Sequence, residues 1–234
     1  MENALKTELS AYLLSFISEK RKSRFDEILA HRTDHLRIVL ENVYQDHNAS
    51  AVLRSCESFG IQHLHFIENR NKLRISDDVS MGSHKWLNIH RHSQSNNNTL
   101  EAIQHLKQKG FRVVATTPHK NNCTLDRLPV DKKLALVFGT ELEGVSQDVF
   151  DHADEFVKIP MLGFTESFNV SVCAAICLYE LSTRIRKNVP DYLLNEQEKL
   201  DVYFEWLKTS IDKSEALIED YLQKKQIRSN PVRL

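Results

Sequence analysis

The fold is decided by residues 134–181, LALVFGTELEGVSQDVFDHADEFVKIPMLGFTESFNVSVCAAICLYEL. Two short runs rich in strand-forming residues, 134–138 and 155–159, predict buried parallel strands, and a polar, glycine-containing loop follows each. From about Asn169, small and apolar residues recur at helical spacing and predict a largely buried helix. Because ligands bind outside the carboxyl ends of parallel strands, the two loops are expected to line one pocket. Two ordinary strand-to-helix connections would give the same pattern.

The residues before this stretch alternate between strand and helix patterns. Strands are expected at 37–43, 63–67, 86–90 and 111–116, with helices from a cap at Asp46 or Asn48 to Gly60 and at 100–109. This alternation predicts an α/β fold with a mostly parallel sheet flanked by helices. The polar stretch 68–85 has no clear period, and its length is typical of a functional or mobile loop.

Both ends of the chain predict helices of their own. Amphipathic spacing indicates helices at 5–16 and 20–31, and two helices or one broken helix at 195–226. The expected organisation is an N-terminal helical extension at 1–35, a central domain at 36–188 and a C-terminal helical extension at 189–234.

The composition of the 234 residues sets broad limits on the class of protein. Charged residues make up 27% and apolar residues 41%, which is ordinary for a soluble globular protein. No apolar run reaches the roughly 18 residues of a membrane span, and Lys6 and Glu8 interrupt the N-terminal segment. We therefore expect no signal peptide, no membrane partner and a cytoplasmic location. The four cysteines form no CxxC pair, so buried thiols are expected rather than a metal site.

Charge and glycine usage limit the classes of ligand and partner further. The formal net charge is −1, so overall charge does not indicate a nucleic-acid partner. Basic residues do cluster near the start, after the long helix and near the end, which is typical of solvated helix faces as well as of RNA contacts. The six glycines form neither GxGxxG nor a P-loop, which argues against the familiar dinucleotide and triphosphate sites.

Three motifs occur in order along the chain: HNASAVLR at 47–54, FGTELEGVS at 138–146 and KIPMLGFTESFNVSVCAA at 158–175. Together with GSHKW at 82–86, they resemble the motifs of the SPOUT methyltransferases of the TrmH type, which methylate a ribose 2′-hydroxyl in tRNA. The resemblance spans about 21–186. It implies an alpha-beta knot, in which the C-terminal segment threads a deep trefoil knot, and a homodimer with its pocket near the interface.

The same resemblance implies S-adenosylmethionine as the cofactor, held by the loops that follow three strands. The positions that match the family's cofactor contacts are Thr116, Gly139, Ile159, Met161, Leu162, Gly163 and Phe168. Phe168 departs from the family pattern, which often has Leu there, and a flat ring is still expected to fit.

Arg54 matches the catalytic arginine of the family. Because a guanidinium stays protonated at ordinary pH, we expect Arg54 to bind a substrate phosphate and to stabilise the developing alkoxide; whether it also accepts the proton stays open. Asn48 and Glu141 would support it through hydrogen bonds. Ser167 and Asn169 match the family's final Ser and Asn, which anchor the knotted loop or the ribose, although both residue types also cap helices.

The resemblance also implies the partner and the reaction. The expected RNA-binding residues are Arg21, Lys22, Arg24, Lys107, Arg184 and Arg186. The expected reaction is methylation of the 2′-hydroxyl of a tRNA guanosine in the D-loop. Only about 36 residues precede the first strand, which argues against the separate N-terminal substrate domain of several ribosomal RNA enzymes of this fold. A same-fold ribosomal RNA methyltransferase and a catalytically silent RNA-binding protein stay open as alternatives.

Overall fold

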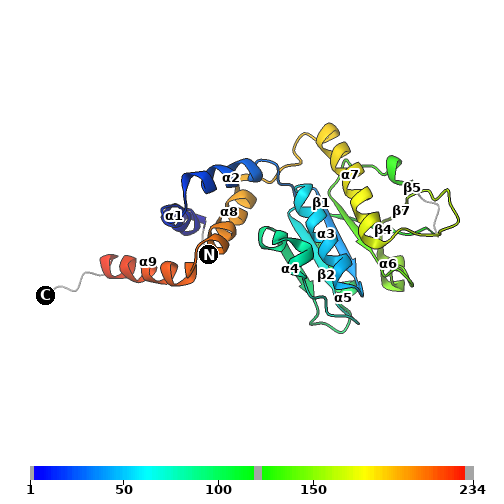
Figure 1. Ribbon diagram of the computed structural model, residues 1–234, viewed down its shortest axis with the longest axis horizontal. Helices are drawn as coiled ribbons and strands as arrows, with labels where there is room; N and C mark the ends of the chain where they lie inside the picture. The colour runs from blue at the N-terminus through cyan, green and yellow to red at the C-terminus, as the bar shows by residue number, and fades with distance from the viewer. Residues whose placement is uncertain (1–2, 119–122, 230–234) are drawn as a thin grey trace. The chain divides into compact units, whose positions relative to one another are not determined.

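The computed structural model describes residues 3–118 and 123–229, and divides the chain into two compact units (Figure 1). One unit is Arg32–Leu193, and the other combines Met1–His31 with Leu194–Leu234. Each unit has its own secondary structure and packing.

A parallel sheet forms the centre of the unit Arg32–Leu193. Within the described residues it has seven strands in the order β3-β2-β1-β6-β4-β7-β5, and all neighbouring strands are parallel. The strands are β1 (Leu36–Glu41), β2 (His63–Ile67), β3 (Asn88–His92), β4 (Arg112–Thr116), β5 (Cys123–Thr124), β6 (Leu134–Phe138) and β7 (Glu155–Lys158). The predicted α/β fold with a mostly parallel sheet is confirmed. Central strands β1 and β6 are buried along their whole length. The unbroken apolar run of β6 predicts this, whereas β1 also buries the charged residues Arg37 and Glu41.

Helices cover both faces of this sheet. The main ones are α3 (Asp46–Ser58) and α7 (Val170–Asn188), which pack against each other, and α5 (Asn98–Gln108) and α6 (Gln147–His152), which do the same. Side chains that alternate along β6 separate the two cores: Leu136 packs in the cluster that contains α3 and α7 residues, and Val137 in the cluster that contains α5 residues. The sheet is therefore a middle layer between two helical layers.

Several short elements and one helix start differ from the sequence prediction. The stretch 68–85 contains the single-turn helix α4 (Asp77–Ser80) and the start of the 3-10 helix η1 (Ser83–Trp86). The elements β5 and η2 (Leu125–Arg127) were not predicted. The predicted cap of α3 is wrong. Its N-cap is Gln45, which makes no side-chain cap hydrogen bond, and Asn48 lies inside the first turn.

The terminal helices pack against each other as the second unit. It contains α1 (Asn3–Leu14), α2 (Glu19–Leu29), α8 (Glu196–Ser210) and α9 (Ser214–Ser229), so the C-terminal segment 195–226 forms two helices. Phe25 of α2 packs edge-on against Tyr203 and Trp206 of α8. Among the described residues, no helix is both long and apolar enough to cross a membrane.

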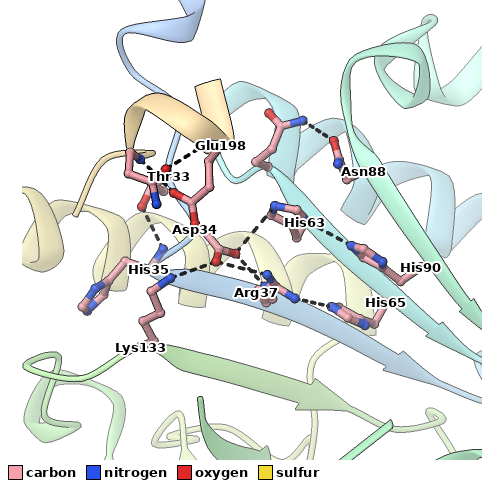
Figure 2. Close-up of polar contacts among 12 residues, drawn as sticks. Thr33, Asp34, His35, Arg37, His63, His65, Asn88, His90, Lys133 and Glu198 are labelled. Carbon is pink, nitrogen blue, oxygen red and sulfur yellow. Dashed lines mark hydrogen bonds and ion pairs between the residues drawn. The ribbon is translucent and has the colours of Figure 1, made fainter. Parts of the chain in front are cut away.

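A polar network lies on the edge of the sheet formed by β2 and β3 (Figure 2). Four of its members, which we call the histidine ladder, are His63 and His65 of β2 and His90 and His92 of β3. Nδ1 of His63 lies 2.9 Å from Nε2 of His90, and Nδ1 of His65 lies 3.0 Å from Nε2 of His92. The rings of His65 and His90 stack with their centroids 4.4 Å apart. The in-register parallel pairing of β2 with β3 makes this repeat possible.

Asp34 and Arg37 hold one side of the ladder and fix its protons. Arg37 forms two hydrogen bonds to the Asp34 carboxylate, at 2.6 and 3.1 Å, and its Nη1 lies 3.4 Å from Nε2 of His65. Since Arg37 can only donate, Nε2 of a neutral His65 accepts and its Nδ1–H donates to His92. Nε2 of His63 lies 3.7 Å from Oδ1 of Asp34, and the carboxylate favours the tautomer with its proton on Nε2, in which Nδ1 accepts from His90. Each pair thus shares one proton, which suits neutral rings.

Candidate functional site

Loops that follow β4, β6 and β7 line a cavity of about 240 Å³ at the carboxyl edge of the sheet. This is far more than the space one water molecule needs, and its position is the one expected for ligands of parallel sheets. Five of the residues predicted to bind the cofactor line it: Thr116, Gly139, Ile159, Met161 and Phe168. Leu162, which is fully exposed, and the exposed Gly163 lie outside its lining.

The cavity combines apolar walls with polar loop residues. Phe138, Val157 and Cys177 are buried side chains of its inner wall. Glu166 and Ser167, on the loop before α7, are exposed members of the lining. Apolar walls with a few polar groups at the rim are typical of sites for flat, partly apolar ligands.

The loop after β6 is a closed hairpin whose shape depends on a glycine. Thr140 and Gly144 exchange two backbone hydrogen bonds, of 2.9 and 3.0 Å, and Oγ1 of Thr140 accepts a third from the Glu143 backbone N–H at 3.0 Å. A Cβ atom on Gly139 would lie 2.0 Å from the carbonyl oxygen of Gly144. Only glycine fits at position 139, and this close approach explains its place in the motif.

Asn48, Glu141 and Asn169 form a group that we call the loop network. Nδ2 of Asn48 donates to Oε1 of Glu141 at 2.5 Å and to Oε1 of Gln45 at 2.9 Å. Nδ2 of Asn169 donates to Oδ1 of Asn48 at 3.2 Å. These contacts join the start of α3, the loop after β6 and the start of α7, which are far apart in the sequence. The structure therefore brings together three of the five predicted catalytic residues.

Asn169 also caps α7, so both of its expected roles are combined. Its Oδ1 accepts from the backbone N–H of Ser171 at 2.9 Å and from the Ser171 hydroxyl at 2.6 Å. The amide group of the same side chain is thereby left to donate to Asn48. The helix start is fixed relative to the loop network by one residue.

Arg54 lies nearly two turns further along α3 and is separate from the loop network. Its side chain is exposed, and within the described residues it has no hydrogen-bond or ion-pair partner. No hydrogen bond or ion pair joins Arg54 to Glu141 in the part of the chain that the structure describes; the Glu141 carboxylate accepts from Asn48 through Oε1. Arg54 is therefore available to bind an anion from outside the chain.

Glu41, at the carboxyl end of β1, is a residue whose importance sequence reasoning missed. Its side chain is 1% exposed and accepts from the Thr99 hydroxyl at 2.6 Å. It also accepts from the backbone N–H of Ser146 at 2.8 Å and from the Ser146 hydroxyl at 2.6 Å. Ser146 is the N-cap of α6 and ends the loop after β6. The available signal was a carboxylate that directly follows the apolar residues Ile38–Leu40 at the end of a strand.

The predicted RNA-binding residues of the α/β unit already have partners within the chain. Lys107 pairs with Asp154 at 2.6 Å, and Arg184 donates to the backbone carbonyls of Leu125 and Leu128 at 2.9 and 2.7 Å. Arg186 donates to the carbonyl of Phe59 at 2.6 Å. Lys107 lies on α5 and the two arginines on α7, which cover opposite faces of the sheet.

The other three predicted RNA-binding residues lie on α2 in the helical unit. Arg21 and Arg24 are exposed and Lys22 is partly exposed. Arg24 pairs with Glu27 at 2.8 Å and Lys22 with Glu19 at 3.9 Å. Such exposed pairs are weak, so these side chains can exchange their partners for phosphates.

A shallow groove runs between α3 and α7 on the outer surface of the unit. Its lining consists of Ala51, Ser55, Ser171, Val172, Ala175, Ile176 and Tyr179. Tyr179 is 63% exposed and Val172 is 47% exposed. Large apolar side chains at that exposure are typical of a surface that a partner covers.

Comparison with known proteins shows which family this architecture represents. The model of the SpoU rRNA Methylase family matches residues 35–179, which is most of the chain. The chain belongs to the SpoU rRNA methylase family. A tRNA (guanosine(18)-2'-O)-methyltransferase of Borreliella burgdorferi is 41% identical over 196 residues, covering 84% of this chain and 88% of that protein. One of Thermus thermophilus is 37% identical over 163 residues, covering 70% and 82%.

A solved structure extends the similarity to three dimensions. The crystal structure of the Aquifex aeolicus TrmH/SpoU tRNA modifying enzyme has a TM-score of 0.74 and is 32% identical. The match covers 83% of this chain and 98% of that one. The resemblance to TrmH-type SPOUT methyltransferases, stated above from three motifs, is confirmed.

Proposed function

We propose that this protein transfers the methyl group of S-adenosylmethionine to the ribose 2′-hydroxyl of guanosine 18 in the D-loop of tRNA. The relatives from Borreliella burgdorferi, Thermus thermophilus and Aquifex aeolicus are named for tRNA modification, the first two for this reaction. The observation that carries the proposal is a cavity outside the strand ends that is lined by motif residues, among them Glu141, which accepts a hydrogen bond from Asn48.

The cavity fits the cofactor chemically. Loop backbone around Gly139, Ile159 and Met161 offers donors and acceptors for the edge of an adenine ring, and buried apolar side chains offer its walls. A Cβ at position 139 would displace the loop that forms one wall. When bound, S-adenosylmethionine supplies an electrophilic methyl group on a sulfonium. Thr116 and Phe168 complete the proposed cofactor set, and Leu162 and Gly163 extend it at the exposed tip of the loop.

Arg54 is proposed to bind the substrate and stabilise charge. Its exposed guanidinium can hold a phosphate of the RNA and stabilise the oxyanion that develops as the hydroxyl loses its proton. Asn48, Glu141 and Asn169 would hold the loops in place, so that the cofactor and the ribose meet in one geometry. Ser167 lines the cavity and is proposed to contact the ribose.

A homodimer is part of the proposal. The groove between α3 and α7 exposes Val172 and Tyr179, and a second copy of the chain is its proposed occupant. Arg54 lies on α3 between the groove residues Ala51 and Ser55, so a copy docked there would approach Arg54. The matching surface on both copies would give a two-fold interface.

The trefoil knot and the tRNA contacts complete the proposal. The chain runs through β4 to β6, which lies beside β1, then returns to β7 on the other side of β4 before α7 packs against α3. This path supports threading of the C-terminal segment. Arg21, Lys22 and Arg24 on α2 are proposed to bind tRNA phosphates, with Lys107, Arg184 and Arg186 contributing where RNA displaces their internal partners.

The test is methyl transfer from labelled S-adenosylmethionine into an unmodified tRNA transcript, followed by nucleoside analysis. We expect 2′-O-methylguanosine at position 18, none in a transcript with 2′-deoxyguanosine there, and loss with Arg54→Ala. Arg54→Lys keeps the charge but not the planar fork, and is expected to retain RNA binding with reduced turnover. Preference for ribosomal RNA fragments would favour the first alternative, and tight tRNA binding without any methylated nucleoside would favour the second.

A further inference from the structure

Two thiols, those of Cys173 and Cys177, face the cavity from α7. Both residues line the cavity, whereas the residues directly before them, Val172 and Ile176, line the groove on the outer side of the helix. Cys177 is 1% exposed, and Cys173 is only partly buried. The proposed function gives neither thiol a role. Cys173 is the one that a small reagent in the cavity can reach.

The surroundings of Cys173 favour its thiolate. Cys173 is in the first turn of a helix of 19 residues, and its backbone N–H donates to the carbonyl of Asn169 at 2.9 Å. A hydrogen bond from the Cys177 thiol lowers the pKa of Cys173, against the effect of burial. The positive end of the helix acts in the same direction.

The other cysteines differ from Cys173 in this respect. Burial raises the pKa of Cys56, which is completely buried in the core. Burial and the nearby Glu155 carboxylate raise the pKa of Cys123, on strand β5. The hydrogen bond to Cys173 and burial raise the pKa of Cys177. Cys173 therefore combines access through a cavity with an environment that stabilises the nucleophilic form.

We propose that Cys173 is an oxidation site inside the cofactor cavity, and that hydrogen peroxide closes the cavity to S-adenosylmethionine by reacting there. The thiolate sulfur attacks one peroxide oxygen, the O–O bond breaks and an S–O bond forms. The departing hydroxide takes a proton and becomes water, and the product is a sulfenic acid. The sulfur is oxidised by two electrons and the peroxide is reduced by two.

The helix keeps the product from becoming a disulfide with Cys177. Residues four apart on a helix have Cβ atoms about 5–6 Å apart, whereas a disulfide needs about 3.5–4.5 Å. The sulfenic acid therefore persists on the wall while α7 stays helical. An added oxygen brings bulk and polarity to a wall that Val170 and Phe138 otherwise make apolar, which disfavours the adenosyl group.

The inference rests on the proposed cofactor cavity, so its test begins with the cofactor product. Binding of S-adenosylhomocysteine to the full chain is measured by calorimetry before and after peroxide treatment, and sulfenic acid is trapped with dimedone and mapped by mass spectrometry. We expect adduct at Cys173, a loss of affinity of at least about tenfold, and recovery with dithiothreitol. Bound S-adenosylhomocysteine is expected to slow the trapping at Cys173.

Two variants separate this site from general oxidation. Cys173→Ser protein, whatever its starting affinity, is expected to keep that affinity after peroxide, whereas Cys123→Ser protein is expected to lose it as the unaltered chain does. If untreated protein does not bind S-adenosylhomocysteine, the proposed cofactor cavity fails. If the untreated protein binds S-adenosylhomocysteine, two results would overturn this inference alone. One is an adduct at Cys173 that leaves the affinity unchanged, and the other is a Cys173→Ser protein that loses as much affinity after peroxide as the unaltered chain.

Discussion

The loop network joins loops that are far apart in the sequence, whereas the histidine ladder joins two neighbouring strands of the sheet. Asn48 and Glu141 are 93 residues apart, and Glu141 itself is exposed. In the ladder, His65 is completely buried, and its rungs repeat with the register of β2 and β3. A network that crosses loops and keeps an open side can hold a ligand. One that closes on itself within a sheet supports the fold.

The largest effect on activity is expected for Gly139→Ala, which would disturb the loop network. The new Cβ would lie 2.0 Å from a backbone oxygen, so the loop that carries Glu141 must move. A displacement of about 1 Å at an active site can cost about 100-fold in rate, and we expect at least that loss of methyl transfer. The measurement is the single-turnover rate together with the affinity for S-adenosylhomocysteine.

The matched variant for folding is Gly163→Ala in the neighbouring loop. A Cβ there meets nothing within 4 Å, so its thermal unfolding should equal that of the unaltered chain. If Gly139→Ala keeps both full rate and full affinity, the loop is not held in the way described.

The second-largest effect is a loss of stability at acidic pH, caused by the histidine ladder. Burial lowers the pKa of His63 to about 3, with Asp34 opposing and Arg37 adding to the shift. Burial, with Arg37 and Lys109 adding to it, lowers the pKa of His90 to about 4. Burial also lowers the pKa values of His65, His92 and the facing His105. The folded state thus favours neutral rings.

The sign of the pH dependence follows from these directions. Below pH 6.5, the ordinary pKa of histidine, the unfolded chain binds protons that the folded chain does not. The free energy of unfolding therefore keeps its highest value above pH 6.5 and falls toward pH 4. Each histidine whose pKa is lowered in the folded state contributes up to about 1.4 kcal/mol per pH unit to this fall. Urea unfolding at pH 7, 6, 5 and 4.5 measures it. Gln at position 63 cannot be protonated, so His63→Gln should make the free energy of unfolding depend less steeply on pH. An unchanged slope in that variant would show that His63 does not contribute to the pH dependence.

A third, smaller effect is expected for Glu41→Gln. The amide oxygen can accept from the Ser146 N–H while the NH₂ group donates to the Thr99 and Ser146 hydroxyls, but these hydrogen bonds lose the charge of the carboxylate. Because hydrogen bonds to a charged group are worth about 1.5–3 kcal/mol and neutral ones about 0.5–1.5, we expect a loss of about 1–3 kcal/mol of unfolding free energy. Because Ser146 ends the loop after β6, the affinity for S-adenosylhomocysteine should fall as well. A stability loss with unchanged affinity would assign Glu41 to the fold only.

Sequence patterns predicted the elements of this fold better than the contacts between them. Strand β2 was placed at its exact bounds and α7 at its cap, because apolar spacing and capping act within a few residues. Strand β5 has two residues, too few to show any period. Asp46 or Asn48 was expected to cap α3, but two of the partners of Asn48, Glu141 and Asn169, lie far along the chain, and no local pattern encodes such a contact. The role of Arg54 stays a prediction, since it depends on a substrate that approaches from outside.

The smallest effect is expected for Arg70→Ala, which tests whether the loop after β6 holds its own shape. Arg70 pairs with Glu143 of that loop at 2.6 Å, but both side chains are about two-thirds exposed. Exposed pairs contribute about 0–1 kcal/mol and weaken with salt. The backbone hydrogen bonds between Thr140 and Gly144 do not involve Arg70, so they should keep the loop closed without it. We therefore expect the free energy of unfolding, measured with urea, and the binding free energy of S-adenosylhomocysteine to stay within about 1 kcal/mol of the values for the unaltered chain. A large loss of affinity would mean that the surface pair, rather than the glycine contact, shapes this wall of the cavity.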